Sequence, residues 1–409
     1  MAAPRPGTEA DAVLGVVPRT VLVPETVEEA VAAVGALARD RMRVAFVGGG
    51  TDLELGAPPE GLDAVLRTER LTRVVEHAPS DQIVAVEAGL PLAELQRQLA
   101  AHGQRLAIDP PHPERATAGG IVAANAFGPL RARYGSARDL IIGVSLVRAD
   151  GVLARGGGKV VKNVAGFDLP RLLVGSLGTL GLVATVTFRL HPLPEAAATL
   201  LFPGLDADQA WGLTREMRSR QLEPAAAAAL SAVGRLDLGV RFEGFGPGVA
   251  QQGDRLLDLG RKAGLAAERL DEAGARAFWE RHDRLRAAGP LRAKLAAPPA
   301  SLPAVVRDAT DPLLRALPGG GFAWYPTLGL GFATGSPASA GAVRAAAEQA
   351  RAALHGLGGS LVLAAAPREV RAVLDVWGPP PPSIGLMRSL KARLDPERRL
   401  APGRFVGGI

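Results

Sequence analysis

Three consecutive glycines and two polar residues, Gly48-Gly49-Gly50-Thr51-Asp52, directly follow the apolar run 43–47. Glycine adopts positive φ angles without steric cost, so this loop can turn several backbone N–H groups towards one point. Such a concave group of amides binds anions, and the Thr51 hydroxyl adds a further donor. A pyrophosphate fits this description. For an isolated run of three glycines the alternative is a tight turn between strands.

The stretch 117–194 holds a second group of glycines, at positions where the backbone must turn tightly or approach another group closely. They are Gly119, Gly120, Gly128, Gly135, Gly143, Gly175, Gly178 and Gly181. Strand-like runs at 140–147 and 182–190 lie among them. Asn125, Tyr134 and Asp139 are polar residues set among small ones. A surface built from such small residues can press its backbone against a large flat ligand.

The motifs GGxxAxNxxG, RYGxxRDL and KNVAGFDLPRLLVGSLGTLG follow one another in this stretch. In this order they resemble the second FAD-binding lobe of the vanillyl-alcohol-oxidase type of flavoproteins. Within that superfamily the chain is most similar to the FAD-binding E subunits of bacterial glycolate oxidase. Leu177, where many members have an acidic residue, supports this narrower similarity. The resemblance implies an α+β protein: a two-lobed PCMH-type FAD-binding domain followed by an α+β cap with an antiparallel sheet.

The same resemblance implies where the cofactor binds. The GGGT loop matches the pyrophosphate loop of the first lobe, Pro110 lies in a turn placed against the flavin, and Val183 lies where backbone atoms hold the adenine. The expected cofactor-binding residues are Val47, Gly48, Gly49, Gly50, Thr51, Asp52, Pro110, Thr117, Gly119, Gly120, Asn125, Gly128, Tyr134, Gly135, Asp139 and Val183. Some relatives attach the flavin through a histidine near this loop. No histidine is near it here, so we expect non-covalent FAD.

The expected domain order follows the motifs and the shifts in composition. Residues 1–20 form a loose N-terminus, and 21–194 form the FAD-binding domain, with lobe one at about 21–90 and lobe two at about 91–194. Residues 195–370 form the cap, and 371–409 return to the FAD-binding domain. In the last segment Leu386, Leu390 and Leu394 make a helical apolar stripe. The ending Pro402-Gly403-Arg404 resembles the usual ending of the family.

Composition excludes several classes of function. The chain of 409 residues has no cysteine, which excludes disulfides and any iron–sulfur cluster ligated by this chain through thiolates. The net charge of +6 comes from arginines scattered among acids, so no nucleic-acid surface is expected. No apolar run reaches the roughly 18 residues of a membrane helix. We expect a cytoplasmic protein that reaches the inner face of the membrane only through partners.

No catalytic residue stands out. The six histidines are isolated at positions 77, 102, 112, 191, 282 and 355. The His-rich motif by which the related D-type subunits and D-lactate dehydrogenases bind a hydroxy acid is not found, and no metal site is expected. His112 is interpreted as a loop residue. Gly156-Gly157-Gly158-Lys159 lacks the pattern of a phosphate loop, and we expect a turn between strands 151–154 and 159–161.

In the cap, Trp324, Tyr325 and Trp377 are candidates for a wall beside the flavin, with ordinary packing as the alternative. Two hypotheses for function follow from the resemblance. In the first, the chain is an FAD-dependent subunit that oxidises a small 2-hydroxy acid, glycolate above all, and passes electrons to a partner. In the second, it is a non-catalytic relay or assembly subunit. Both imply a sister flavin subunit and an iron–sulfur subunit as partners. A flavin-free scaffold and a stand-alone FAD oxidoreductase of another substrate are further alternatives.

Overall fold

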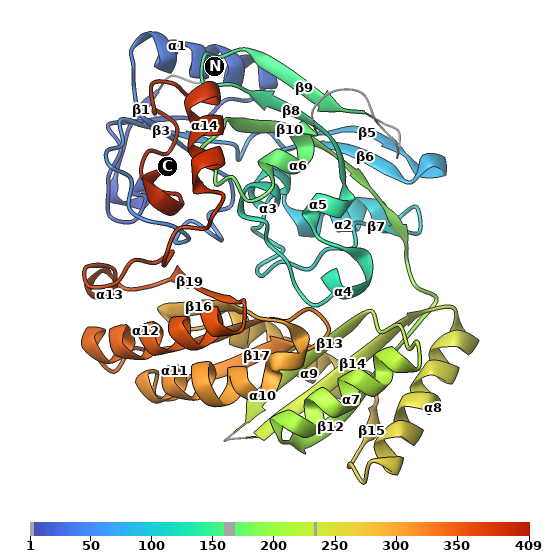
Figure 1. Ribbon diagram of the computed structural model, residues 1–409. Helices are drawn as coiled ribbons and strands as arrows, with labels where there is room; N and C mark the ends of the chain where they lie inside the picture. The colour runs from blue at the N-terminus through green and yellow to red at the C-terminus, as the bar shows by residue number, and fades with distance from the viewer. Residues whose placement is uncertain (1–3, 159–167, 233–234) are drawn as a thin grey trace. The chain divides into compact units, whose positions relative to one another are not determined.

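The computed structural model describes residues 4–158, 168–232 and 235–409. The chain divides into two compact units (Figure 1). The first unit comprises Met1–Gly128, Tyr134–Leu193 and Pro379–Ile409, and the second comprises Pro129–Arg133 and Pro194–Gly378. The first unit is therefore assembled from segments that lie far apart in the sequence.

One sheet of the first unit has four strands in the order β1-β2-β4-β3. Their bounds are Arg5–Pro6, Thr20–Leu22, Ala64–Arg67 and Val44–Val47. β2, β4 and β3 are parallel. Helix α1 (Val27–Arg39) begins after Thr26, whose hydroxyl accepts a hydrogen bond from the Glu29 amide at 3.1 Å, and it buries one apolar face made of Val27, Ala30, Ala33, Val34 and Leu37.

The N-terminal residues from 4 onwards are folded, which corrects the expectation of a loose segment over 1–20. β1 pairs antiparallel with β2. Asp11 is 3% exposed, and its carboxylate accepts hydrogen bonds from Arg5 Nη1 at 2.7 Å and Arg67 Nη2 at 2.8 Å. The segment lacks a periodic pattern because pairing with distant residues, and not an apolar face of its own, holds it in place.

A second sheet has five antiparallel strands in the order β5-β6-β10-β8-β9. Their bounds are Val74–Ala78, Ile83–Glu87, Leu182–Arg189, Ile141–Val147 and Leu153–Gly157. β5 and β6 belong to this sheet, so the sheets do not divide at residue 90, where the lobe boundary was expected. A two-stranded sheet pairs β7 (Gln104–Arg105) with β11 (His191–Pro192). The helices of this unit in the same part of the chain are α2 (Leu92–Ala100), α3 (Ala118–Ala124), α5 (Ala137–Leu140) and α6 (Leu169–Leu173), and the short helix α4 (Arg131–Tyr134) spans the division between the two units.

The glycines at 156 and 157 lie in a strand, which corrects the turn expected there. Gly156 pairs with Val144 and Gly157 with Gly143 along β9. A Cβ on Gly156 would lie 2.6 Å from Cβ of Leu169, so glycine is required there by the close packing of α6. The strand expected at 159–161, and Lys162, Asn163 and Phe167 of the family-like motif, lie outside the described residues.

The second unit is built on an eight-stranded antiparallel sheet in the order β15-β12-β14-β13-β17-β18-β16-β19. The strand bounds in that order are Glu268–Leu270, Ala196–Leu205, Arg235–Gly244, Ala226–Ala232, Gly321–Tyr325, Leu330–Gly335, Leu291–Ala296 and Ser360–Ala365. The expectation of an α+β cap with an antiparallel sheet is confirmed.

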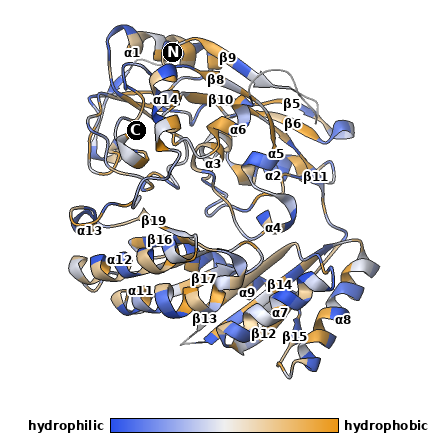
Figure 2. Cartoon of the chain, in the orientation of Figure 1, coloured by the Kyte–Doolittle hydropathy of each residue, from blue (hydrophilic) through white to orange (hydrophobic). Residues whose placement is uncertain are grey.

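The helices of this unit are α7 (Ala207–Ser219), α8 (Gly246–Lys262), α9 (Glu272–Ala287), α10 (Leu302–Ala304), α11 (Asp311–Ala316), α12 (Ala340–Gly356) and α13 (Arg368–Arg371), with a π-helical turn at Val305–Thr310. In Figure 2 the longer helices carry both hydrophilic and hydrophobic residues, as expected for helices with one face in the core and one in water. Trp324 and Tyr325 are fully buried within this unit, so packing accounts for both.

The chain returns to the first unit through α14 (Ile384–Leu394). Of the apolar stripe expected on this helix, Leu386 is 66% exposed, whereas Leu390 and Leu394 are half-buried and Leu394 packs against the core of the first unit. Lys391 is the fully buried residue of the helix, at 3% exposure. The most buried side chain of this helix is therefore charged, and an analysis of apolar periodicity could not find it.

Candidate cofactor site

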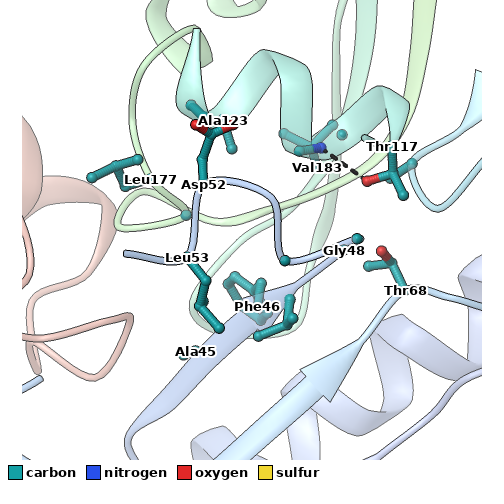
Figure 3. Close-up of a pocket in the computed structure, with 18 of the residues that line it drawn as sticks. Ala45, Phe46, Gly48, Asp52, Leu53, Thr68, Thr117, Ala123, Leu177 and Val183 are labelled. Atoms are coloured by element: carbon teal, nitrogen blue, oxygen red, sulfur yellow. Dashed lines mark hydrogen bonds between the residues drawn. The ribbon is translucent and has the colours of Figure 1, made fainter. Parts of the chain in front are cut away.

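A cavity that is partly open to solvent lies in the first unit; the empty space in and around it, open solvent included, is about 850 Å³. Its lining comes from β3 and the loop after it, from single residues just after β4 and β6, and from helix α3 with the residue before it. The turn before β10, the first residues of that strand and the C-terminal segment complete the lining. The lining residues are Ala45, Phe46, Val47, Gly48, Gly49, Gly50, Thr51, Asp52, Leu53, Thr68, Ala88, Thr117, Gly119, Gly120, Ala123, Ala124, Leu177, Gly178, Gly181, Leu182, Val183, Ala401 and Arg404. Figure 3 shows the loop passing through this group.

The glycine loop packs too closely for side chains. A Cβ on Gly48 would lie 2.3 Å from Oγ1 of Thr117, and a Cβ on Gly49 would lie 1.7 Å from the Arg115 carbonyl oxygen. Gly48 lies between Thr68 and Thr117 in Figure 3. Gly50 has a φ of +71°, a conformation that favours glycine. The loop is therefore pressed against the segment that precedes α3.

Helix α3 begins at Thr117, whose hydroxyl accepts a hydrogen bond from the Gly120 amide at 3.3 Å. A Cβ on Gly119 would lie 2.6 Å from Cβ of Ala88, at the end of β6. The GG pair thus lets the first turn of the helix approach the sheet. One hydroxyl, that of Thr117, both caps α3 and contacts the glycine loop.

The turn Leu177–Gly181 closes another side of the cavity. Leu177 and Gly178 have φ angles of +52° and +73°. The Leu177 amide donates to the Ala123 carbonyl at 2.9 Å, which links this turn to the C-terminal end of α3. Val183, at the start of β10, also lines the cavity.

The C-terminal segment supplies Ala401 and Arg404. The Val44 amide donates to the Arg399 carbonyl, and the Ala401 amide donates to the Val44 carbonyl, each at 2.8 Å. The segment therefore forms a parallel β-bridge with β3, in which Leu400 lies opposite Val44. Arg404 is 4% exposed, and its Nη2 donates to the carbonyl oxygens of Leu53 and Leu55.

The chemistry of the cavity fits FAD. Its glycine loop leaves no room for a Cβ at Gly48 or Gly49, and within the described chain no hydrogen bond to a protein group is donated by the backbone amides of Gly49 and Gly50. Such amides suit the pyrophosphate. The alanines and the side chains of Phe46, Leu53 and Leu177 offer apolar surface for flat rings. The cavity lining includes no histidine, cysteine or tyrosine that could form a covalent bond to a flavin.

Ten of the sixteen cofactor-binding residues expected from the sequence line this cavity: Val47, Gly48, Gly49, Gly50, Thr51, Asp52, Thr117, Gly119, Gly120 and Val183. The other six, Pro110, Asn125, Gly128, Tyr134, Gly135 and Asp139, do not line it. They lie at 110–128 and 134–139 of the first unit, and local structure accounts for several of them.

Gly128 is required because a Cβ there would lie 2.4 Å from the Asp109 carbonyl oxygen. Asp139 completes a capping box at the start of α5: its Oδ2 accepts from the Ser136 amide and hydroxyl, each at 2.8 Å. Gly135, at a φ of +83°, makes room for Asp139. The capping of helix α5 therefore accounts for the spacing of Gly135, Ser136 and Asp139 in the motif YGSxxD.

Asn125 is the left-handed residue that ends α3, with a φ of +51°. The Tyr134 hydroxyl accepts a hydrogen bond from Arg105 Nη2 at 2.9 Å, and its ring contacts that of His191. Pro110 is buried. These residues remain candidates for contact with the flavin, and the cavity geometry does not place them in its lining.

The histidines are not all isolated in space. The rings of His77 and His102 lie 4.8 Å apart, and His77 Nε2 is 2.9 Å from Gln104 Oε1. His112, in a left-handed conformation and partly exposed, lies 3.6 Å from Glu114 and does not line the cavity. Over residues 4–158, 168–232 and 235–409, no three acidic, histidine or cysteine residues gather as a metal site. No helix in these ranges is long and apolar enough to span a membrane.

Sequence reasoning missed part of the lining. Thirteen lining residues were not singled out as site residues: Ala45, Phe46, Leu53, Thr68, Ala88, Ala123, Ala124, Leu177, Gly178, Gly181, Leu182, Ala401 and Arg404. Leu177, Gly178 and Gly181 were noted among the motifs and glycines, and Arg404 had a usable signal in the family-like ending Pro402-Gly403-Arg404. The other apolar residues had none, because apolar lining and apolar core look alike in a sequence.

Comparison with known proteins agrees with this chemistry. Residues 18–157 match the family described as "FAD binding domain". Glycolate oxidase subunit GlcE of Escherichia coli is 36% identical over 162 residues, which cover 39% of this chain and 46% of that protein. D-lactate dehydrogenase of Archaeoglobus fulgidus is 35% identical over 208 residues, covering 50% of this chain and 46% of that protein. The chain thus matches less than half the length of these two relatives.

Solved structures match over nearly the whole chain. Alkyldihydroxyacetonephosphate synthase superposes with a TM-score of 0.73 at 19% identity, covering 96% of this chain and 78% of that one. p-Cresol methylhydroxylase superposes with a TM-score of 0.70 at 16% identity, covering 95% and 89%. The fold is that of the PCMH-type FAD-binding proteins, and FAD is the cofactor, as the sequence motifs predict.

Proposed function

We propose that this chain is the FAD-binding subunit of a 2-hydroxy-acid oxidase or dehydrogenase complex, with glycolate as its first candidate substrate. The observation that carries the proposal is the glycine-lined cavity, most of whose lining residues lie within the stretch 18–157 that matches the FAD binding domain, in a chain that is similar to glycolate oxidase subunit GlcE. Glycolate oxidase subunit GlcD of Bacillus subtilis is also similar, at 33% identity over 192 residues that cover 46% of this chain and 41% of that protein.

The bound FAD supplies the capacity to accept a hydride or electrons. The chain's own groups bind and orient it: the glycine loop offers amides to an anion, and Thr117 fixes the loop against α3. The apolar residues Phe46, Leu53 and Leu177 exclude water from part of the cavity. We expect the FAD to be held without a covalent bond, since the lining lacks a residue that could attach it.

The partners in this proposal are a sister flavin subunit and an iron–sulfur subunit, which take the electrons onward. Two features of the sequence support dependence on partners: the chain has no cysteine to hold a cluster, and it lacks the His-rich motif of the related D-type subunits. The cytoplasmic location, at the inner face of the membrane through these partners, belongs to the same proposal.

The same features favour a second candidate function, in which the chain binds FAD but a sister subunit oxidises the hydroxy acid. The chain then relays electrons or stabilises the assembly. In the second unit, His282 and Tyr325 are fully buried and bonded to each other, so they offer no exposed acid–base pair to a substrate. The two candidates differ in whether the isolated chain reacts with substrate.

The deciding experiment is an anaerobic titration of the purified, FAD-loaded chain with glycolate and, in parallel, D-lactate, followed by its visible spectrum. Bleaching by glycolate in the isolated chain establishes a complete oxidation site here. Bleaching only after the sister flavin subunit is added supports the relay candidate. A chain whose flavin is not reduced by either acid, alone or with the sister and iron–sulfur subunits, contradicts both. Acid precipitation that releases all the FAD tests its non-covalent binding.

A further inference from the structure

The side chain of Arg404, one of the cavity-lining residues, connects the C-terminal segment to the loop after β3. Its Nη2 donates to the carbonyl oxygens of Leu53 at 2.8 Å and Leu55 at 2.7 Å. Its own carbonyl accepts from the Ala57 amide at 3.0 Å. The stretch that begins with the glycine loop is thus held by both the side chain and the backbone of one residue.

The position of Arg404 depends in turn on buried polar contacts upstream. Asp395 is fully buried, and its carboxylate accepts from the Leu400 amide at 2.8 Å and from Lys391 Nζ at 2.7 Å. Lys391 Nζ also donates to the Leu400 carbonyl at 2.8 Å. These bonds fix the segment just before Ala401 and Arg404, the two C-terminal residues of the cavity lining.

Glycine is required next to Arg404. Gly403 has a φ of +79°, and a Cβ there would lie 2.5 Å from Cγ of Glu60. The Glu60 amide donates to the Pro402 carbonyl at 2.9 Å. The ending Pro402-Gly403-Arg404 therefore forms a tight connection with residues 53–60 and is not an unattached tail.

We propose that Arg404 is the positioning residue of the FAD site: it holds residues 48–57 in the conformation that closes the cavity, and FAD affinity depends on it. This inference rests on the proposed function only in taking FAD as the ligand, and it is independent of substrate and partners. A loop with three glycines has high conformational freedom when it is not held. Arg404 removes that freedom before FAD binds, which lowers the cost of binding.

The geometry makes a specific demand on the side chain. One nitrogen, Nη2, donates to both loop carbonyls. The ammonium of a lysine is also a single nitrogen with several donors, so Arg404→Lys retains the bridge in large part. The amide of Arg404→Gln is uncharged and on a shorter stem, so it does not span both carbonyls. The contrast between these two variants therefore tests the charge and the reach of the side chain together.

The test compares FAD affinity in Arg404→Gln, Arg404→Lys and the control Arg398→Gln, measured by fluorescence titration of the apo full-length chain. Arg398 belongs to the same segment, and its Nη2 also donates to a backbone carbonyl, that of Gly408 at 2.7 Å, outside the cavity lining. We expect Arg404→Gln to weaken FAD binding about tenfold or more, the factor that corresponds to losing one or two charged hydrogen bonds. Arg404→Lys recovers most of the affinity, and Arg398→Gln stays at the wild-type value.

Equal affinity in Arg404→Gln and Arg398→Gln overturns the proposal while leaving FAD as the cofactor. A wild-type chain that does not bind FAD overturns both this proposal and the assignment of FAD as the cofactor. If Arg404→Gln does not fold, hydrogen exchange on the wild-type chain decides: FAD is expected to slow exchange in residues 49–57 and in 400–404 together. Slowing in 49–57 alone shows that the C-terminal segment is not coupled to the site, and the proposal fails.

Discussion

The ammonium of Lys391 lies 2.8 Å from the carbonyl oxygen of Thr179, a residue 212 positions earlier in the chain. Thr179 lies in the turn whose neighbours Leu177, Gly178 and Gly181 line the cavity. The same ammonium bonds Asp395 and the Leu400 carbonyl. One buried cation therefore joins the turn before β10 to the C-terminal segment that carries Arg404. Burial lowers the pKa of Lys391 below its usual value, and the hydrogen bond that Lys391 donates to Asp395 opposes this effect.

Lys391→Met is expected to lower the free energy of unfolding by about 3–5 kcal/mol, because it leaves the Asp395 carboxylate buried without its cation. The control is Lys262→Met, which removes an exposed ion pair with Asp258 and is expected to cost less than about 1 kcal/mol. Urea unfolding of both apo variants measures the two values. Equal losses in the two variants would show that the Lys391 pair contributes no more than a surface pair.

Gly49→Ala is expected to weaken FAD binding by about tenfold or more, since its Cβ would lie 1.7 Å from the Arg115 carbonyl oxygen, and a backbone atom yields less easily than the end of a side chain. The loop must shift away from the segment before α3, and the resulting strain costs about 1–3 kcal/mol. Gly212→Ala in α7 is the control, because no heavy atom lies within 4 Å of its Cβ. The FAD-to-protein ratio after reconstitution and gel filtration checks this. Stoichiometric FAD in Gly49→Ala would contradict the role of the glycine cradle.

The residues changed in these two variants, Lys391 and Gly49, differ in how well their roles can be predicted from the sequence. Gly49 could be assigned to a cofactor loop because three glycines directly after a buried strand are typical of either a tight turn or an anion-binding loop. The order of the motifs along the chain favoured the anion-binding loop. The cap's antiparallel sheet was likewise predictable from its strand patterns. Lys391 could not be assigned, because the pattern of α14 pointed to Leu386, which is exposed. A buried lysine is explained only by the carbonyls of Thr179 and Leu400, and no local pattern shows such distant partners.

The order of the N-terminal segment has the same kind of origin. Arg5 and Arg67, 62 positions apart, meet at the Asp11 carboxylate, which residue type and spacing do not reveal. The expectation of a looser segment was wrong because it counted only local features. Similarly, the lobe boundary near residue 90 followed the motifs, whereas hydrogen bonding places β5 and β6 beside β10.

Asp11→Asn is expected to lower the free energy of unfolding by about 2 kcal/mol at pH 7, because a neutral amide replaces a carboxylate in charged hydrogen bonds. The hydrogen bond from Arg5 is the largest cause that lowers the pKa of Asp11 far below its usual 3.8. A carboxyl group whose pKa is lower in the folded chain than in the unfolded chain stabilises the fold at pH values above its unfolded pKa. This stabilisation is lost as the pH falls below about 4.

The difference in the free energy of unfolding between wild type and Asp11→Asn should therefore be smaller at pH 3 than at pH 7, because pH 3 lies below the pKa of the carboxyl group in the unfolded chain, about 4. Asp81→Asn, at an exposed position, serves as the control and should leave the pH dependence unchanged. A difference of the same size at both pH values would show that the Asp11 carboxylate acts through shape and not through charge.

His282 gives the second unit a pH dependence of its own. The side chain is buried at 1% exposure, with Nε2 2.9 Å from the Tyr325 hydroxyl and Nδ1 3.0 Å from Asp283 Oδ1. Burial is the main cause that lowers the pKa of His282 below its ordinary 6.5, and the nearby Arg286 acts in the same direction, while Asp283 opposes both. Below pH 6.5 the unfolded chain thus takes up a proton that the folded chain resists, so stability falls as pH decreases through this range.

His282→Gln removes this titration and retains a group that can bond Tyr325. At pH 7.5 the variant is expected to be less stable by about 1–2 kcal/mol, the cost of an imperfect buried hydrogen bond. At pH 5 the difference should shrink, because only the wild type is destabilised by protonation of the unfolded chain. Urea unfolding at both pH values measures it, with the exposed His355→Gln as the control. A parallel loss of stability with falling pH in wild type and His282→Gln would assign the acid sensitivity to other groups.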